Sequence, residues 1–479
     1  MAKGHAGHMV RGTIWSVLQA VGDKGLIAIL TLVLARMLGP EEIGVAAVAT
    51  GPVMIVISAL RGFSDVVVRA EEETPSLLNA VFWVALAAAV VGAILTALIA
   101  LGIWGAREDG ARLVEMACAA SVAGPLAALA AVPEGLLARR FQFRALFLRK
   151  IVGALVGVVA AIAVVALGGG GWSLVAFLLV SQAVGALAAV LAARWRVTRQ
   201  TAFAPAWHAL TFSGRLFTAE LLYQIIPRAL ELACGAISGL HAAGVIRISL
   251  QITEAATNLL HVPVGRMLFS IAARLTDDVG RVRSALLDVY SVALFAGSAA
   301  CATIFVAVPL VVDVLLGAGW DQVVIVTQVL CLIQITYGVD VPIRESLKAR
   351  GEVGRFLLVA ILASAASVAI ILSSAMFGVY PAAVGYLLGA IISATLSLVV
   401  GRGALGLKAA DILAPLARQL GVLAPALVVA TFCAAGGGAI AGMAGAAVVY
   451  LTMSWILQRR MMLALYGRLV ASLDRTVPA

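Results

Sequence analysis

Charged side chains occur inside long apolar stretches of this sequence, where a membrane helix would normally exclude them. Arg228 and Arg247 are the most central of the cations, and both carry guanidinium groups. On insertion scales a charge at the centre of a membrane helix costs about 2.5 to 3.5 kcal/mol, so such residues need an oppositely charged partner or water. A guanidinium group can engage two oxygens of one anionic group at once. The sequence therefore predicts a wet, partly cationic cavity for an anionic substrate, with Arg228 and Arg247 as the first candidates.

Three further cations are candidates for the same cavity, and each has an alternative explanation. Lys24 directly follows Asp23, and these two charges could neutralise each other. Arg61 and Arg266 lie near the ends of apolar stretches, from which a long side chain can extend to the membrane surface. The sequence leaves substrate binding and these structural roles open for all three.

Carboxylates share the apolar stretches with the cations and permit a second interpretation of the arginines. Glu231 follows Arg228 by three residues and Glu254 follows Arg247 by seven, so each arginine could simply be neutralised by a neighbouring carboxylate. Carboxylates inside a membrane could also bind a coupling cation. The candidates for that role are Asp23, Glu254 and Asp340.

Two copies of an E-x-L-x-A-R pattern occur, each at the end of an apolar stretch. They are "EGLLAR" at 134–139 and "ESLKAR" at 345–350. Glu134 and Glu345 could form ion pairs with arginines that hold the two lobes together as a gate when one side is closed, or they could have a purely structural role, which the sequence favours.

The elements that must position these residues are membrane-spanning helices. The chain of 479 residues is 63% hydrophobic and 12% charged, with a mean hydropathy of +1.08, well beyond the range of soluble domains. Its apolar runs are continuous rather than alternating at period two, which indicates helices and not a barrel. We predict an all-α polytopic protein with about fourteen spans, centred near residues 25, 52, 90, 122, 158, 182, 225, 252, 296, 331, 364, 390, 425 and 446.

The distribution of Lys and Arg predicts the orientation of these spans. Most of the 34 basic residues fall on the side of the N-terminus and of every second loop, whereas the opposite side holds Arg36, Arg107 and Arg112. The positive-inside rule then places both termini in the cytoplasm. The net charge of +10 is accordingly attributed to topology and to contact with anionic membrane lipids, not to nucleic acid.

The chain contains an internal repeat. Gly39 and Gly44 recur as Gly239 and Gly244, the E-x-L-x-A-R pattern recurs, and "GGGGWSLV" at 168–175 corresponds to "GVYPAAVG" at 378–385. All three pairs are six spans apart and in the same order, which predicts two parallel six-helix halves. The expected organisation is a first half at 1–200, a second half at 201–400, and two additional helices with a tail at 401–479.

Several stretches of the first half resemble the Wzx-type polysaccharide flippases of the multidrug, oligosaccharidyl-lipid and polysaccharide exporter superfamily. They are "RGTIWSVLQAVGDKG", "LARMLGPEEIGVAAVAT", "NAVFWVAL", "ARRFQFRAL" and "GGGGWSLVA". The resemblance implies a V-shaped pair of lobes in the bacterial inner membrane. It implies movement of an undecaprenyl-diphosphate-linked oligosaccharide from the cytoplasmic to the periplasmic leaflet, for exopolysaccharide, capsule or lipopolysaccharide O-antigen synthesis. In the related lipid II flippase two extra C-terminal helices form a groove for the isoprenoid tail, and the last two helices here are expected to do the same.

Other functions are less consistent with the sequence. It contains no Walker-type nucleotide motif, no zinc-ligand spacing and no nucleophile constellation, so we expect neither an enzyme nor a bound cofactor or metal. A cation-coupled multidrug antiporter of the same superfamily is an alternative, but it should have twelve spans. A non-transporting scaffold for a glycan synthesis complex is the third. We expect a monomer, in contact with a polymerase or other assembly proteins.

Overall fold

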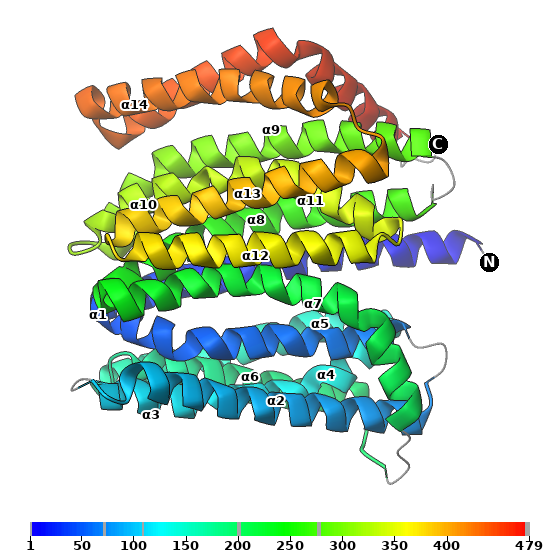
Figure 1. Ribbon diagram of the computed structural model, residues 1–479, viewed down its shortest axis with the longest axis vertical. Coiled ribbons are helices and arrows are strands. Elements are labelled where there is room, and N and C mark those ends of the chain that lie inside the picture. Colours follow the sequence, from blue (N-terminus) through cyan, green and yellow to red (C-terminus); the bar gives the residue numbers. More distant parts are fainter. Residues whose placement is uncertain (1, 70–72, 108–109, 199–202, 275–278, 475–479) are drawn as a thin grey trace.

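The structure is a computed structural model that describes residues 2–69, 73–107, 110–198, 203–274 and 279–474. Side chains are described within these ranges except mainly at residues 2–30, 203–213, 269–282 and 457–474. The described ranges are helical and contain no strand. Figure 1 shows the helices lying side by side with their connections gathered at two ends of the bundle, and both chain termini at the same end.

The first element, α1 (Ala2–Arg69), consists of two helices joined at Gly39. Gly39 has φ 76° and ψ 169°, a conformation that only glycine adopts without strain. Pro40 follows as the first residue of the second helix, where its missing N–H costs nothing. The stretch "ARMLGPEEIG" is therefore the turn between two spans, as its composition indicates.

The helices α2–α6 complete the N-terminal part. The short α3 and α4 form one apolar span that is interrupted at Val122. In this group α5 packs on α6, while α4 contacts both α1 and α6. The bounds are α2 (Pro75–Trp104), α3 (Gly110–Ser121), α4 (Ala123–Arg139), α5 (Phe143–Ala166) and α6 (Trp172–Ala193).

The helices α7–α13 form the second group, which lies above α2–α6 in Figure 1. Two of its helices end in a π-helical turn: η1 continues α7 and η2 continues α9. The bounds are α7 (Phe203–Ala233), η1 (Cys234–Ser238), α8 (Leu240–Arg274), α9 (Val279–Val311), η2 (Val312–Leu316), α10 (Asp321–Cys331), α11 (Ile333–Ala349), α12 (Val353–Ala375) and α13 (Val379–Leu405).

The repeated sequence positions have matching local structure. Gly239 has φ 101° and ψ 164°, so it breaks the chain before α8 as Gly39 breaks α1. The break between α10 and α11 at Leu332 matches the break at Val122. These agreements are those that a repeat predicts, and the division of the chain at residues 200 and 400 stays a prediction.

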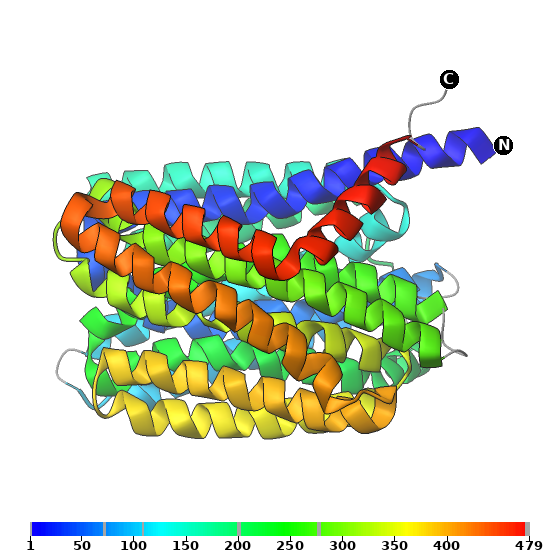
Figure 2. The ribbon, with the colours of Figure 1, turned by 90° about the horizontal axis from the view of Figure 1, so that it is seen from above.

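The last element, α14 (Ala409–Asp474), lies along α9 on the outside of the second group (Figures 1 and 2). Buried polar groups join these two helices. The Tyr450 hydroxyl lies 2.8 Å from the Ser298 hydroxyl and donates to the Phe295 carbonyl at 3.1 Å, and the Gln419 amide donates to both hydroxyls. The chain reverses within α14 (Figures 1 and 2), where Gly438 has φ 78°, so Gln419 and Tyr450 lie on its two arms and both arms are attached to α9 by these hydrogen bonds.

Ten helical segments within the described residues are long and apolar enough to cross a membrane. Large apolar side chains on them face outward, among them Leu98 and Leu187 with 57% and 60% of their surface exposed. An outer surface of this kind suits lipid, because hydrocarbon does not penalise exposed apolar groups. The predicted all-α polytopic membrane class is confirmed, and the count of fourteen spans stays a prediction.

Candidate functional site

Two arginines and two glutamates form a compact cluster between α7 and α8, which we call the four-charge cluster: Arg228, Glu231, Arg247 and Glu254. Arg228 Nη1 lies 2.5 Å from Glu231 Oε1, and Arg228 Nη2 lies 3.3 Å from Glu254 Oε1. Arg247 Nη1 donates to both carboxylate oxygens of Glu231 at 3.2 Å. Sequence reasoning selected both arginines as binding candidates, and the structure brings them onto one carboxylate.

Burial differs sharply across the four-charge cluster. The Glu231 side chain is fully buried, whereas Arg228 and Arg247 keep 16% and 18% of their side-chain surface exposed and Glu254 keeps 34%. A fully buried carboxylate without a partner would be very costly, so the two guanidinium groups are required to hold Glu231 in place. The cluster therefore has a closed side at Glu231 and an open side at Glu254.

The helix α1 covers the closed side of the cluster. A Cβ atom built at Gly51 of α1 would lie 3.6 Å from Glu231 Oε2, which is ordinary van der Waals contact. Gly51 is itself buried. The four-charge cluster consequently lies where the N-terminal helices meet α7 and α8, between the two predicted halves.

One of the two expected ion pairs is present and the other is replaced. Arg228 pairs with Glu231 across three residues, as their spacing indicates. The expected pairing of Arg247 with Glu254 is wrong, because Arg247 pairs with Glu231 and Glu254 pairs with Arg228. Seven residues of α-helix rise about 10 Å, which places Glu254 two turns beyond Arg247 along α8.

The other cationic candidates are not brought into this cluster by the described contacts. Arg61 lies on α1 with an exposed side chain, next to Gly62, which packs against Phe217 of α7. Lys24 and Asp23 lie in α1 and Arg266 lies in α8, but the side chains of these three residues are outside the described ones. Their roles stay predictions.

A second buried charge pair, in α11, includes an arginine that sequence reasoning missed. Asp340 is 2% exposed and pairs with Arg344 at 3.0 Å. It also accepts a hydrogen bond from Ser397 at 2.5 Å, and the Arg344 guanidinium lies 4.0 Å from the centre of the Tyr223 ring. The spacing of four residues could have revealed this pair, since it places both side chains on one helix face.

The two repeated glutamates form ion pairs, but each pair stays within its own group of helices. Glu134 of α4 contacts Arg149 of α5. Glu345 contacts Lys348 at 2.5 Å, and Lys348 also contacts Glu220 of α7 at 2.7 Å. The expectation that these glutamates join the halves through arginines is therefore not met by these contacts, and the partner of Glu345 is a lysine.

Hydrogen bonds between the two groups of helices lie at the end of the bundle that holds Gly39. Arg36 donates to the Val314 carbonyl at 2.6 Å, and Arg107 donates to the Ala236 carbonyl at 3.0 Å. Both carbonyls belong to π-helical turns, Val314 in η2 and Ala236 in η1. A π-helical turn disrupts the regular i to i−4 ladder, which leaves carbonyls for such donors. At this end the two groups of helices are in direct contact.

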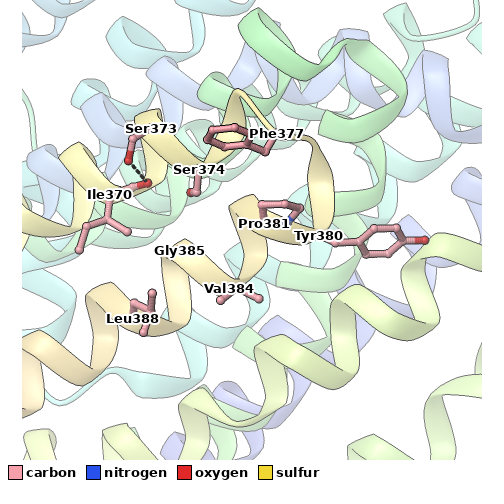
Figure 3. Close-up of a pocket in the computed structure, with 9 residues that line it drawn as sticks. All are labelled: Ile370, Ser373, Ser374, Phe377, Tyr380, Pro381, Val384, Gly385 and Leu388. Carbon is pink, nitrogen blue, oxygen red and sulfur yellow. Dashed lines mark hydrogen bonds between the residues drawn. The ribbon is translucent and has the colours of Figure 1, made fainter.

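A pocket is found elsewhere in the structure. It is an apolar recess of about 540 Å³ on the hairpin of α12 and α13, and Phe377 and Tyr380 stand at its rim (Figure 3). None of its lining residues is charged. A recess of this kind suits a lipid chain better than an anionic group, so we do not place the anion site there. Among the described residues no group of three or more His, Cys, Asp or Glu side chains could hold a metal ion.

Comparison with known protein families identifies the family of this chain. The profile described as "Polysaccharide biosynthesis protein" matches residues 33–325, which is more than half of the 479 residues. The chain belongs to this polysaccharide biosynthesis family. The matched region begins within α1 and ends within α10, and it contains the whole four-charge cluster.

A curated relative of this polysaccharide biosynthesis protein is the succinoglycan biosynthesis transport protein ExoT of Rhizobium meliloti. The two are 33% identical over 183 residues, which cover 37% of this chain and 36% of the relative. The match thus spans about a third of the relative's length.

Solved structures of other proteins have the same fold as this chain. The lipid II flippase MurJ in an inward closed conformation covers 95% of this chain and is itself covered completely, with a TM-score of 0.74 at 14% identity. An inward-facing multidrug resistance transporter of the MATE family, from the MOP superfamily, covers 82% of this chain and is covered to 94%, with a TM-score of 0.60 at 16% identity. At these identities the likeness concerns the fold, and it confirms the predicted superfamily fold.

Proposed function

We propose that this protein is a flippase that moves a polyprenyl-diphosphate-linked oligosaccharide from the cytoplasmic to the periplasmic leaflet of a bacterial inner membrane. The observation that carries the proposal is the convergence of Arg228 and Arg247 on one buried carboxylate where the two groups of helices meet. The family supports a role in polysaccharide synthesis, and the relatives named above are a succinoglycan transport protein and a lipid II flippase.

In this proposal the diphosphate binds at the open side of the four-charge cluster. Arg228 and Arg247 come from different helices, so together they can engage oxygens of both phosphate groups. The glycan then lies between a lobe of residues 1–200 and a lobe of residues 201–400. The polyprenyl chain stays in lipid, beside the helices of residues 401–479.

Alternating access would move the two lobes relative to each other around this cluster. The Arg36 and Arg107 contacts hold the lobes together on what we take to be the periplasmic side, with both termini in the cytoplasm. An inside-negative potential favours the export of an anion by about 2.3 kcal/mol per charge and per 100 mV. Coupling to a cation through Asp23, Glu254 or Asp340 is the alternative source of energy.

Flipping of a lipid-linked oligosaccharide in proteoliposomes tests the proposal. Arg228→Gln and Arg247→Gln should each lower the flipping rate at least tenfold, because each removes one charge-assisted contact to the diphosphate. Arg355→Gln is the matched control, since Arg355 is 48% exposed and pairs with Glu352 at the start of α12. Unchanged flipping by both cluster variants, with normal insertion, would overturn the site. Repeating the assay under an imposed potential or cation gradient distinguishes the two energy sources.

A further inference from the structure

The two glutamates of the four-charge cluster have unequal contacts with the arginines. Glu231 bridges Arg228 and Arg247 at 2.5 and 3.2 Å and is fully buried. Glu254 contacts Arg228 alone, at 3.3 Å, and keeps 34% of its side-chain surface exposed. Strong charge-assisted N–H to O bonds are about 2.7 to 2.9 Å long, so the Glu254 contact is the weaker of the two. Glu231 therefore holds the two arginines in place, and Glu254 is the carboxylate that a ligand could displace.

The donors of the arginines show which contact a ligand would have to displace. A guanidinium group has five N–H donors in a planar fork. On Arg228, Nη1 points to Glu231 and Nη2 points to Glu254. On Arg247, Nη1 supplies both described contacts to Glu231. An incoming anion that takes the Arg228 Nη2 hydrogen now directed at Glu254 must therefore displace Glu254.

The charges of the cluster lead to the same conclusion. Two guanidinium groups and two carboxylates sum to zero, so the empty cluster offers little attraction to an anion as long as Glu254 remains paired. A phosphate that approached Arg228 beside Glu254 would add a like-charge contact, which is unfavourable by several kcal/mol at close range. An anion that takes the place of Glu254 keeps Arg228 neutralised and leaves Glu231 undisturbed.

We propose that Glu254 is a specificity-determining residue: it occupies the anion-binding donors of Arg228 in the empty transporter, and the diphosphate group displaces it. This inference rests on the proposed function. Glu231 acts as a positioning residue, because it holds both guanidinium groups beside one carboxylate. A diphosphate offers more acceptor oxygens and more negative charge than a single phosphate, so it compensates better for the loss of Glu254, and a single phosphate displaces Glu254 poorly. Discrimination arises because every anion must displace the Glu254 carboxylate, and a diphosphate replaces the lost contact with more charge-assisted hydrogen bonds than a single phosphate can form.

Calorimetric titration of the purified full-length protein with inorganic diphosphate and, separately, inorganic phosphate tests this inference. Glu254→Gln should bind diphosphate about tenfold more tightly than the unmodified protein and should also bind phosphate, because the competing charge is gone. Glu231→Gln should bind diphosphate more weakly. Glu352→Gln, which removes a carboxylate paired with Arg355 at 3.4 Å, is the control and should change neither affinity.

The outcomes separate the inference from the proposed function. If Glu254→Gln binds both anions as the unmodified protein does, while Arg228→Gln loses diphosphate binding, the role of Glu254 is refuted and the site remains. If Arg228→Gln and Arg247→Gln bind diphosphate normally, or if no form of the protein binds it, the site and the inference both fail. Glu254→Gln changes a partly exposed carboxylate to its isosteric amide, and the ratio of the two affinities reports specificity independently of stability.

Discussion

Gly44 and Gly244 face each other where α1 crosses α8. A Cβ atom built at Gly44 would lie 1.8 Å from the Leu240 carbonyl oxygen, and one built at Gly244 would lie 1.9 Å from the Pro40 carbonyl oxygen. Each of these Cβ positions is also close to the backbone nitrogen of the other glycine, at 3.0 and 3.1 Å. The contact is therefore reciprocal, as expected where two copies of a repeat meet across an axis of approximate symmetry.

Adding a methyl group at either glycine should separate the two helices. Gly44→Ala and Gly244→Ala each place a carbon against a backbone oxygen that cannot rotate away, and overpacking of this kind costs about 1 to 3 kcal/mol. We expect a lower midpoint of thermal unfolding in detergent for both variants. Gly102→Ala is the control, because the Cβ site at Gly102 in α2 has no atom within 4 Å. Equal midpoints for all three variants would contradict the close crossing.

The two arginine contacts at this end should limit access to the interface. Arg36→Gln and Arg107→Gln weaken the bonds to the Val314 and Ala236 carbonyls, each by about 1 kcal/mol or less because both arginines are exposed. Cys234 lies in η1 and is fully buried, so it reports opening of this end. With the other four cysteines replaced by alanine, maleimide should label Cys234 faster in the double variant than in the parent.

The matched control for that experiment is Arg355→Gln, which removes an exposed charge from the start of α12 and makes no described contact to η1 or η2. Faster labelling of Cys234 in the control, or unchanged labelling in the double variant, would mean that the arginine contacts do not close this end.

The polar contacts of Tyr450 should contribute to the attachment of α14. Tyr450→Phe removes a buried hydroxyl that donates to Phe295 at 3.1 Å and accepts from Gln419 at 3.2 Å. Loss of such bonds, with partners left buried, costs about 1 to 3 kcal/mol. We expect faster tryptic cleavage after Arg418, which is exposed on α14. Tyr380→Phe is the control, since that ring is 38% exposed, and cleavage as fast as in Tyr450→Phe would rule out a specific effect.

Stability should depend on pH through Glu73, in the connection between α1 and α2. Its carboxylate lies 2.8 Å from Arg140 and 3.4 Å from Arg139, and the hydrogen bond from Arg140 lowers the pKa of Glu73. Because the pKa of Glu73 is lower in the folded state, its ionised form stabilises the fold fully above the unfolded-state pKa of about 4.3. This stabilisation is lost as the pH falls through the folded-state pKa. Glu73→Gln should therefore lower the unfolding midpoint at pH 7, and the difference should shrink as the pH falls below the unfolded-state pKa of about 4.3. A difference that persists in acid would contradict this assignment.

Local sequence signals predicted local structure well. The Gly-Pro pair at residues 39 and 40 indicated a turn because glycine alone tolerates the required backbone angles, and the three-residue spacing of Arg228 and Glu231 indicated their ion pair. The contact of Arg247 with Glu231 joins two helices, so it depends on how α7 and α8 pack, which no spacing along one helix reveals.

The positions of the helix breaks and π-helical turns could not be predicted from the sequence either. The breaks at Val122 and Leu332 lie inside continuous apolar runs, and η1 and η2 have no composition that separates a π-helical turn from an α-helix. Arg344 was missed for another reason. Basic residues as closely spaced as Arg344 and Lys348 are typical of connecting loops, whereas the structure extends α11 through Arg344 and buries its pair with Asp340.

The crossing of Gly44 with Gly244 constrains how this protein can evolve. A side chain added at either position strikes the main chain of the other helix, and the residue opposite is already the smallest one available. No replacement at one glycine can therefore compensate for a replacement at the other. Second-site suppressors of a Gly44 variant should arise at residues that set the tilt of α1 against α8, and positions 44 and 244 should not co-vary even though they touch.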